Sequence, residues 1–143
     1  MSIDIGLKDD AREASVAAVQ RVLGETYALY SKTHGYHWNV TGPRFKSLHE
    51  LFMEQYTELW AALDELAERI RALGHFAPGS GGEMAQFASI QPDNGVPDAE
   101  DMIGNLVRGH EAVARAARDG VKIAEESDDV VTADLLTQRA TIA

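Results

Sequence analysis

The stretch HWNVTGPRFKSLHELFMEQYTELWAALDELAE, residues 37–68, decides how this chain is built. It places two histidines, His37 and His49, and two carboxylates, Asp64 and Glu68, along one expected helix and the turn that leads into it. Imidazole nitrogen together with carboxylate oxygen suits iron or zinc better than calcium or magnesium. The stretch therefore predicts a metal site for iron or zinc.

The spacing of these residues predicts that the site is shared between two copies of the chain. On a helix, the fifteen positions from His49 to Asp64 span about 22 Å, whereas metal–ligand bonds are only about 2 Å long. Asp64 and Glu68 lie on adjacent turns and can hold one ion together. An antiparallel pairing about a two-fold axis would bring them onto His37 and His49 of the other chain, with two sites per dimer.

Length and composition exclude several classes of protein and of metal site. A length of 143 residues fits a single domain, expected to span residues 1–143. The absence of cysteine excludes disulfides, thiolate zinc sites and iron–sulfur clusters. No apolar run approaches the roughly 20 residues of a membrane helix, and the opening MSIDIGLKDD has no secretion-signal pattern. We therefore expect a cytoplasmic protein without a membrane partner.

The formal net charge of −10 argues against a nucleic-acid partner. DNA affinity comes mainly from Lys and Arg side chains that neutralise phosphates. The segment before the first expected helix offers only Lys8, beside Asp4, Asp9 and Asp10. The sequence therefore argues against DNA binding, whereas metal cations would be attracted.

Apolar residues recur at helical spacing along nearly the whole chain, which predicts an all-α fold. A first helix should run from Asp9 or Asp10 to Tyr36 or His37, before the turn Gly42-Pro43. A second should run from about residue 45 to 73 and stop at Gly74. The expected core positions of this second helix are Leu48, Leu51, Phe52, Leu59, Leu63, Leu66, Ile70 and Leu73.

Two further helices are expected after a long connection. Residues 75–97 are rich in Gly and Pro, with EMAQFASI at 83–90 as a short helix, and a crossover this long fits second and third helices that run parallel. The third helix should start near Asp98 and end at the SDD of residues 127–129. The fourth, from 129 to 143, has about half the length of the second and ends abruptly, so we expect truncation or a bundle incomplete at one end. The expected apolar positions of these two helices are Met102, Ile103, Leu106, Val107, Val113, Val121, Val131, Leu135, Leu136 and Ile142.

Several segments, in order along the chain, resemble the Dps proteins (DNA-binding proteins from starved cells) of the ferritin superfamily: KTHGYHWNVTGPRF, SLHELF, YTELW, LDELAERIRALG and TADLLTQR. The resemblance implies a ferritin-like four-helix bundle, with a short helix in the long crossover, assembled as a hollow dodecamer. It also implies a ferroxidase that oxidises Fe(II), preferably with hydrogen peroxide, and stores ferric mineral. The chain lacks the Glu-x-x-His pair of other ferritin-like di-iron bundles, which favours the Dps arrangement.

The resemblance also assigns individual residues. The family's metal ligands fall on His37 and His49 of one subunit and on Asp64 and Glu68 of its partner. Trp38, directly after the first histidine, would lie beside the iron and absorb oxidising equivalents; the simpler interpretation makes Trp38 and Trp60 packing residues. Met53 stands where the family often has an acidic ligand, and a thioether is a poor ligand for iron.

Other polar residues have two interpretations each. Glu50, Glu54 and Glu58 form either an ordinary wet helix face or an inner surface that nucleates ferric oxide. The resemblance implies that Asp128, Asp129 and Asp134 line a pore that attracts cations, whereas helix capping explains Asp128 or Asp129 equally well. His110 is expected to be a hydrogen-bonded core residue, and His34 and His75 to be structural or solvated.

Three functions compete at this level. The first is a peroxide-consuming ferroxidase and iron store that protects DNA and cell from oxidative stress. The second is a DNA-binding protein of the nucleoid, which the negative charge disfavours. The third is a structural cage that holds zinc or no metal, which the complete set of histidine and carboxylate ligands disfavours.

Overall fold

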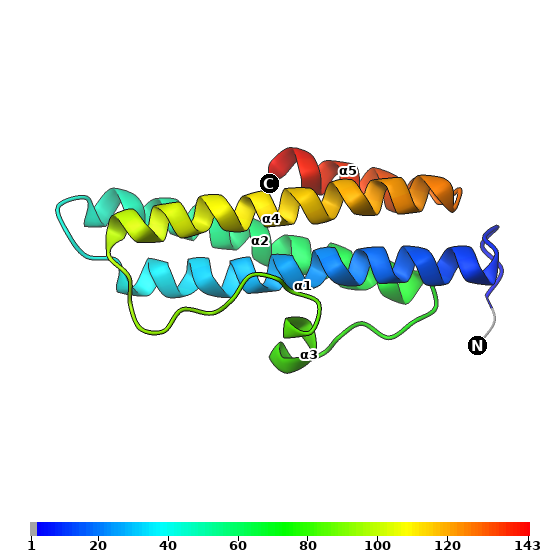
Figure 1. The fold of residues 1–143 in the computed structure, drawn as a ribbon, viewed down its shortest axis with the longest axis horizontal. Helices are drawn as coiled ribbons and strands as arrows, with labels where there is room; N and C mark the ends of the chain where they lie inside the picture. Colours follow the sequence, from blue (N-terminus) through cyan, green and yellow to red (C-terminus); the bar gives the residue numbers. More distant parts are fainter. Residues whose placement is uncertain (1–2) are drawn as a thin grey trace.

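A computed structural model describes residues 3–143, which form five helices and no strand (Figure 1). The four long helices are α1 (Asp9–Asn39), α2 (Phe45–Ala72), α4 (Ala99–Glu126) and α5 (Val130–Ile142), and the short α3 (Gly81–Ala85) lies in the crossover. α1 and α2 run antiparallel, whereas α2 and α4 run in the same direction (Figure 1). The predicted four-helix bundle with a short helix in its long crossover is confirmed.

Local chemistry explains the helix boundaries. The carboxylates of Asp98 and Asp129 cap α4 and α5 by accepting hydrogen bonds from backbone N–H groups three residues ahead, at 2.8 and 3.0 Å. Gly74 ends α2 with a φ of +91°, a conformation that glycine adopts without strain. α1 runs to Asn39 and therefore continues beyond the predicted end at Tyr36 or His37.

The bundle buries two apolar clusters along its length. One gathers around Leu23, Leu66 and Ile70 near the start of α1, and the other around Leu29 and Phe52 near its end. Four positions expected in the core are instead exposed: Leu51, Val107, Val131 and Ile142. Leu51 and Val107 line a cavity of about 350 Å³ beside Ala143, because α5 does not extend along that part of the groove between α2 and α4.

The crossover departs from its predicted secondary structure. The short helix spans residues 81–85 rather than 83–90, because backbone groups near its predicted end bind a buried carboxylate. Glu25 on α1, only 2% exposed, accepts hydrogen bonds from the Ser89 N–H and hydroxyl, both at 2.5 Å, and from the Ile90 N–H at 3.1 Å. Gly24 lets α3 and the residues directly after it pack closely on α1. A Cβ added at Gly24 would lie only 2.6 Å from the Cβ of Phe87.

Among the described residues, no helix combines the length and apolar character needed to cross a membrane. The longest, α1, is interrupted by charged and polar residues throughout.

Candidate metal centre

The two histidines predicted as metal ligands are hydrogen-bonded to each other's backbone. His37 lies in the last turn of α1 and His49 in the first turns of α2, joined by the short loop of residues 40–44. His37 Nδ1 lies 2.7 Å from the carbonyl oxygen of His49, and His49 Nδ1 lies 2.7 Å from the carbonyl oxygen of His37. The carbonyl of His37 is available because α1 ends two residues later, which leaves its last carbonyls without helical partners.

These reciprocal bonds fix the protonation of both rings. A carbonyl oxygen can only accept a hydrogen bond, so both Nδ1 atoms carry the proton and donate it. A neutral imidazole protonated at Nδ1 has its free lone pair on Nε2. Metal-binding histidines are commonly held in this way, through a hydrogen bond from the second ring nitrogen to a carbonyl or carboxylate. The Nε2 atoms of His37 and His49 are therefore available to bind a metal ion.

The rings of His37 and His49 lie face to face. They stack with centroids 3.8 Å apart and planes 16° from parallel. Lone pairs that lie in two nearly parallel planes do not converge on a single point. Phe45 stacks on the other side of His49, with centroids 5.0 Å apart, and restricts rotation of that ring. Each Nε2 could therefore bind an ion of its own, as in two-metal sites.

The carboxylates predicted as ligands lie far from these histidines in the same chain. Asp64 and Glu68 are exposed on the C-terminal half of α2, and neither forms an ion pair with another residue of the 3–143 range. Over that range, no three His, Asp or Glu residues come close enough to hold one ion. Within one chain, the two histidines and the two carboxylates are therefore separate groups, and a site shared between two chains stays a prediction.

Comparison with known proteins identifies the family to which the chain belongs. The ferritin-like domain family matches residues 16–141. A low temperature-induced protein of Nostoc sp. is 42% identical over 137 residues, which are 94% of this chain and 76% of that protein. DNA protection during starvation protein 2 of Bacillus anthracis is 36% identical over 121 residues, 85% of this chain and 83% of the relative. The chain belongs to the Dps family of the ferritin superfamily.

Solved Dps structures share the whole fold. The crystal structure of the Dps protein from Vibrio cholerae, described as a ferritin-like diiron-carboxylate protein, matches with a TM-score of 0.92 at 30% identity, covering 99% of this chain and 89% of that one. DpsC from Streptomyces coelicolor matches with a TM-score of 0.93 at 28% identity, covering 97% and 81%. The bundle described above is therefore the ferritin-like fold of Dps proteins.

A stripe of exposed residues on α2 lies between His49 and the two carboxylates. Met53 is 45% exposed and Trp60 is 64% exposed, and Asp64 and Glu68 continue the same stripe. Trp38, at the end of α1, is 66% exposed. The interpretation of Trp38 and Trp60 as packing residues is wrong within one chain, because neither is covered by another part of it.

Sequence reasoning missed an aromatic cluster beside His37. The ring of His34 stacks on Tyr56 with centroids 3.8 Å apart, and its Nδ1 lies 3.0 Å from the hydroxyl of Tyr30. Trp38 contacts the same ring at 4.3 Å, and Tyr56 meets His37 edge-on at 5.2 Å. Burial, and then the nearby His37, lower the pKa of His34. The spacing of Tyr30, His34 and Trp38, four residues apart on one helix face, was the available signal.

Two of the acidic residues for which the sequence left two interpretations form ion pairs within the chain. Glu58 receives two hydrogen bonds from the buried Arg139, at 2.5 and 2.9 Å, and is not a free carboxylate of a mineral-binding face. Asp129 is buried, caps α5 and pairs with Arg69 at 3.0 Å, so the capping interpretation is correct for it. Glu50, Glu54, Asp128 and Asp134 are exposed.

The expectation of a hydrogen-bonded core histidine at position 110 is wrong. His110 is half-buried, and its Nε2 atom is shielded from solvent without a hydrogen-bond partner among the described residues. Burial is the main cause that lowers the pKa of His110. The charge of Glu58 raises this pKa and the charge of Arg139 lowers it, and both effects are smaller than that of burial. The ring is therefore held in its neutral form, in which one nitrogen need not donate a hydrogen bond.

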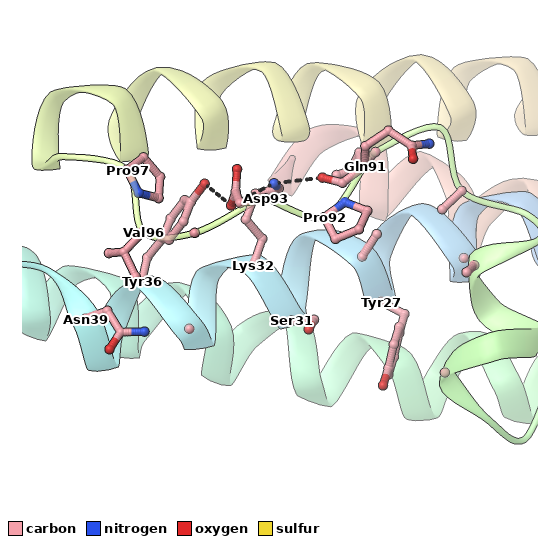
Figure 2. Close-up of a pocket in the computed structure, with 18 residues that line it drawn as sticks. Tyr27, Ser31, Lys32, Tyr36, Asn39, Gln91, Pro92, Asp93, Val96 and Pro97 are labelled. Carbon is pink, nitrogen blue, oxygen red and sulfur yellow. Dashed lines mark hydrogen bonds and ion pairs between the residues drawn. The ribbon is translucent and has the colours of Figure 1, made fainter.

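A cavity of about 350 Å³ lies under the crossover, away from the metal-ligand residues (Figure 2). Asp93 closes part of its wall by accepting hydrogen bonds from the Tyr36 hydroxyl at 2.6 Å and from the Lys32 ammonium at 3.1 Å (Figure 2). Burial and the Asp93 hydrogen bond raise the pKa of Tyr36 above its usual range. These bonds hold the residue next to His37 in place and fasten the crossover to α1.

Proposed function

We propose that this chain is a ferroxidase and iron-storage protein that oxidises Fe(II), preferably with hydrogen peroxide, and retains ferric mineral inside a hollow dodecamer. The observation that carries the proposal is the reciprocal bonding of His37 and His49, which leaves a ligating Nε2 on each ring. Membership of the Dps family supports the use of these histidines for iron rather than for another metal.

The proposed site forms between two subunits. His37 and His49 of one chain would meet Asp64 and Glu68 of a second chain across a two-fold axis, so that each dimer holds two sites. The exposed stripe of Met53, Trp60 and the two carboxylates supports this interface, because large apolar side chains are seldom left uncovered in the final assembly. Within residues 3–143 of one chain, in contrast, no three His, Asp or Glu side chains lie close enough to hold an ion.

The chemistry consumes two damaging reactants together. Two Fe(II) ions at neighbouring positions each give one electron, and hydrogen peroxide accepts both as its O–O bond breaks, which yields water after protonation. A paired two-electron step avoids release of hydroxyl radical, which single-electron reduction of peroxide would produce. Trp38, exposed beside His34 and next in sequence to His37, is placed to absorb oxidising equivalents that escape this step. The cell and its DNA would be protected in this way, and the cytoplasmic location stays a prediction.

Rapid mixing tests the proposal directly. Metal-free protein is loaded anaerobically with Fe(II) and mixed with peroxide while ferric absorbance is followed. We expect a fast phase that Asp64→Asn nearly abolishes, since it removes an anionic ligand. Glu65→Gln, an exposed neighbour on the same helix, serves as the matched control and should keep the fast phase. Equal rates in the two variants would contradict the proposed ligand set.

A nucleoid-binding function is the less favoured alternative. The names of several relatives refer to DNA protection, but the charge of −10 per chain opposes contact with phosphates. Five of the basic residues are already paired with carboxylates: Arg12, Arg21, Lys32, Arg69 and Arg139. We expect plasmid DNA to migrate unretarded in a gel-shift at physiological salt, and retardation that fades with added salt would favour the alternative.

A further inference from the structure

The second metal position differs in chemistry from the first. The ring of His49 is held between His37 and Phe45, with centroids 3.8 and 5.0 Å away, so it cannot turn to share the ion of His37. The residue one helical turn further along α2 is Met53. Residues four apart on a helix are neighbours with Cβ atoms roughly 5–6 Å apart, so Met53 neighbours His49 on the same face of α2 and offers its thioether there.

Met53 is free to act as a ligand in this chain. It is 45% exposed and belongs to neither of the two core clusters, unlike the fully buried Met102. Glu54, the adjacent carboxylate, points about 100° further round the helix and does not replace it. The donors that this chain offers at the second position are therefore one imidazole nitrogen and one thioether sulfur.

We infer that the His49–Met53 pair is a binding site for Cu(I). Thioether sulfur selects soft ions such as Cu(I), imidazole also suits copper, and ferrous or ferric iron prefers oxygen ligands. The inference rests on the proposed function only in sharing His49, because both donors come from one chain. Copper binding should therefore not need the carboxylates of a second subunit.

Competition for Cu(I) tests the site. Metal-free full-length protein is titrated anaerobically against the chromophoric Cu(I) chelator bicinchoninate. Wild type should take up one Cu(I) per chain, and Met53→Leu, a substitution of similar volume, should bind it at least about tenfold more weakly, the loss that even an outer-shell change can cause. Met84→Leu is the matched control and should bind Cu(I) as wild type does. X-ray absorption should show one sulfur neighbour of copper, which disappears in Met53→Leu.

Two comparisons separate the copper site from the proposed ferroxidase. Asp64→Asn should retain Cu(I) while losing rapid Fe(II) oxidation, whereas Met53→Leu should lose Cu(I). Equal Cu(I) affinity in wild type and Met53→Leu, or copper without a sulfur neighbour, would overturn the copper site and leave the ferroxidase proposal intact. Copper binding that depends on Met53 in a protein that does not oxidise Fe(II) would overturn only the ferroxidase.

Discussion

His37 and His49 each donate a hydrogen bond from Nδ1 to the other's backbone carbonyl, at 2.7 Å in both directions. This exchange joins the end of α1 to the start of α2 and sets both rings in the tautomer that binds metal through Nε2. It uses a carbonyl that the end of α1 leaves unpaired. The helix boundary and the ligand geometry are therefore parts of the same local structure.

Met53→Asp should improve the second iron position. The substitution replaces a neutral sulfur beside His49 with an anionic oxygen donor. Iron prefers the oxygen donor. We expect Fe(II) affinity to rise by about tenfold or more, because changes to groups that only support the metal ligands already alter affinity on this scale. The fast phase of oxidation should also become faster. Structures soaked in Fe(II) should show one strong and one faint peak per site in wild type. Two peaks of equal occupancy in wild type would show that another group fills the place of Met53.

Glu25→Ala should loosen the crossover and lower stability. The substitution removes both carboxylate oxygens, so the N–H groups of Ser89 and Ile90 lose their acceptor. We expect a loss of about 1–3 kcal/mol in the free energy of unfolding, the cost of an unsatisfied buried group, with faster hydrogen exchange at residues 86–97. Glu13→Ala, exposed on the same helix, is the control, and equal urea midpoints for the two variants would rule out the anchoring role.

Asp129 should make stability depend on pH in the acid range. Burial alone would raise its pKa, but hydrogen bonds from Thr132 and the charge of Arg69 outweigh burial and lower the pKa below the unfolded value of 3.8. The stabilisation is therefore present above that value and is lost as pH falls through the folded pKa. Asp129→Asn should cost about 1.5–3 kcal/mol at neutral pH and progressively less below pH 3.8.

Urea unfolding at several pH values checks this, with Asp128→Asn as the control. Asp128 is exposed and has a φ of +58°, which Asn tolerates well. A deficit of Asp129→Asn that stays constant down to the lowest pH would show that the charge of Asp129 contributes nothing.

Much of the fold followed from the sequence because it depends on local periodicity. The four long helices and the proximity of His37 and His49 required only helix spacing and the Gly42-Pro43 turn. The parallel course of α2 and α4 followed from the length of the crossover. The buried Glu25 was missed, although its spacing from Val22 and Leu29 places it on the inner face of α1. A charged residue is normally exposed, and nothing local shows that the backbone of residues 89–90 returns to pair with it.

Contacts between distant segments could not be predicted. Glu58 and Arg139, which form an ion pair, lie 81 positions apart in the sequence. Because of this pairing, the Glu58 carboxylate is not part of the solvated face that was predicted for α2. The exposure of Leu51 and Val107 depends on where α5 stops relative to the groove, which helical periodicity does not reveal. The shared metal site itself was inferred from a distance, since one helix cannot bring His49 and Asp64 together.

Mixed oligomers test that shared site most directly. His49→Ala and Asp64→Asn chains, each expected to be inactive alone, are co-expressed with different tags, and Fe(II) oxidation by peroxide is measured on oligomers that contain both. In each mixed dimer one site combines two defects and the other is intact, so random mixing should restore about a quarter of wild-type activity. Mixed oligomers as inactive as the single variants would contradict a site built from His37 and His49 of one subunit and Asp64 and Glu68 of its partner.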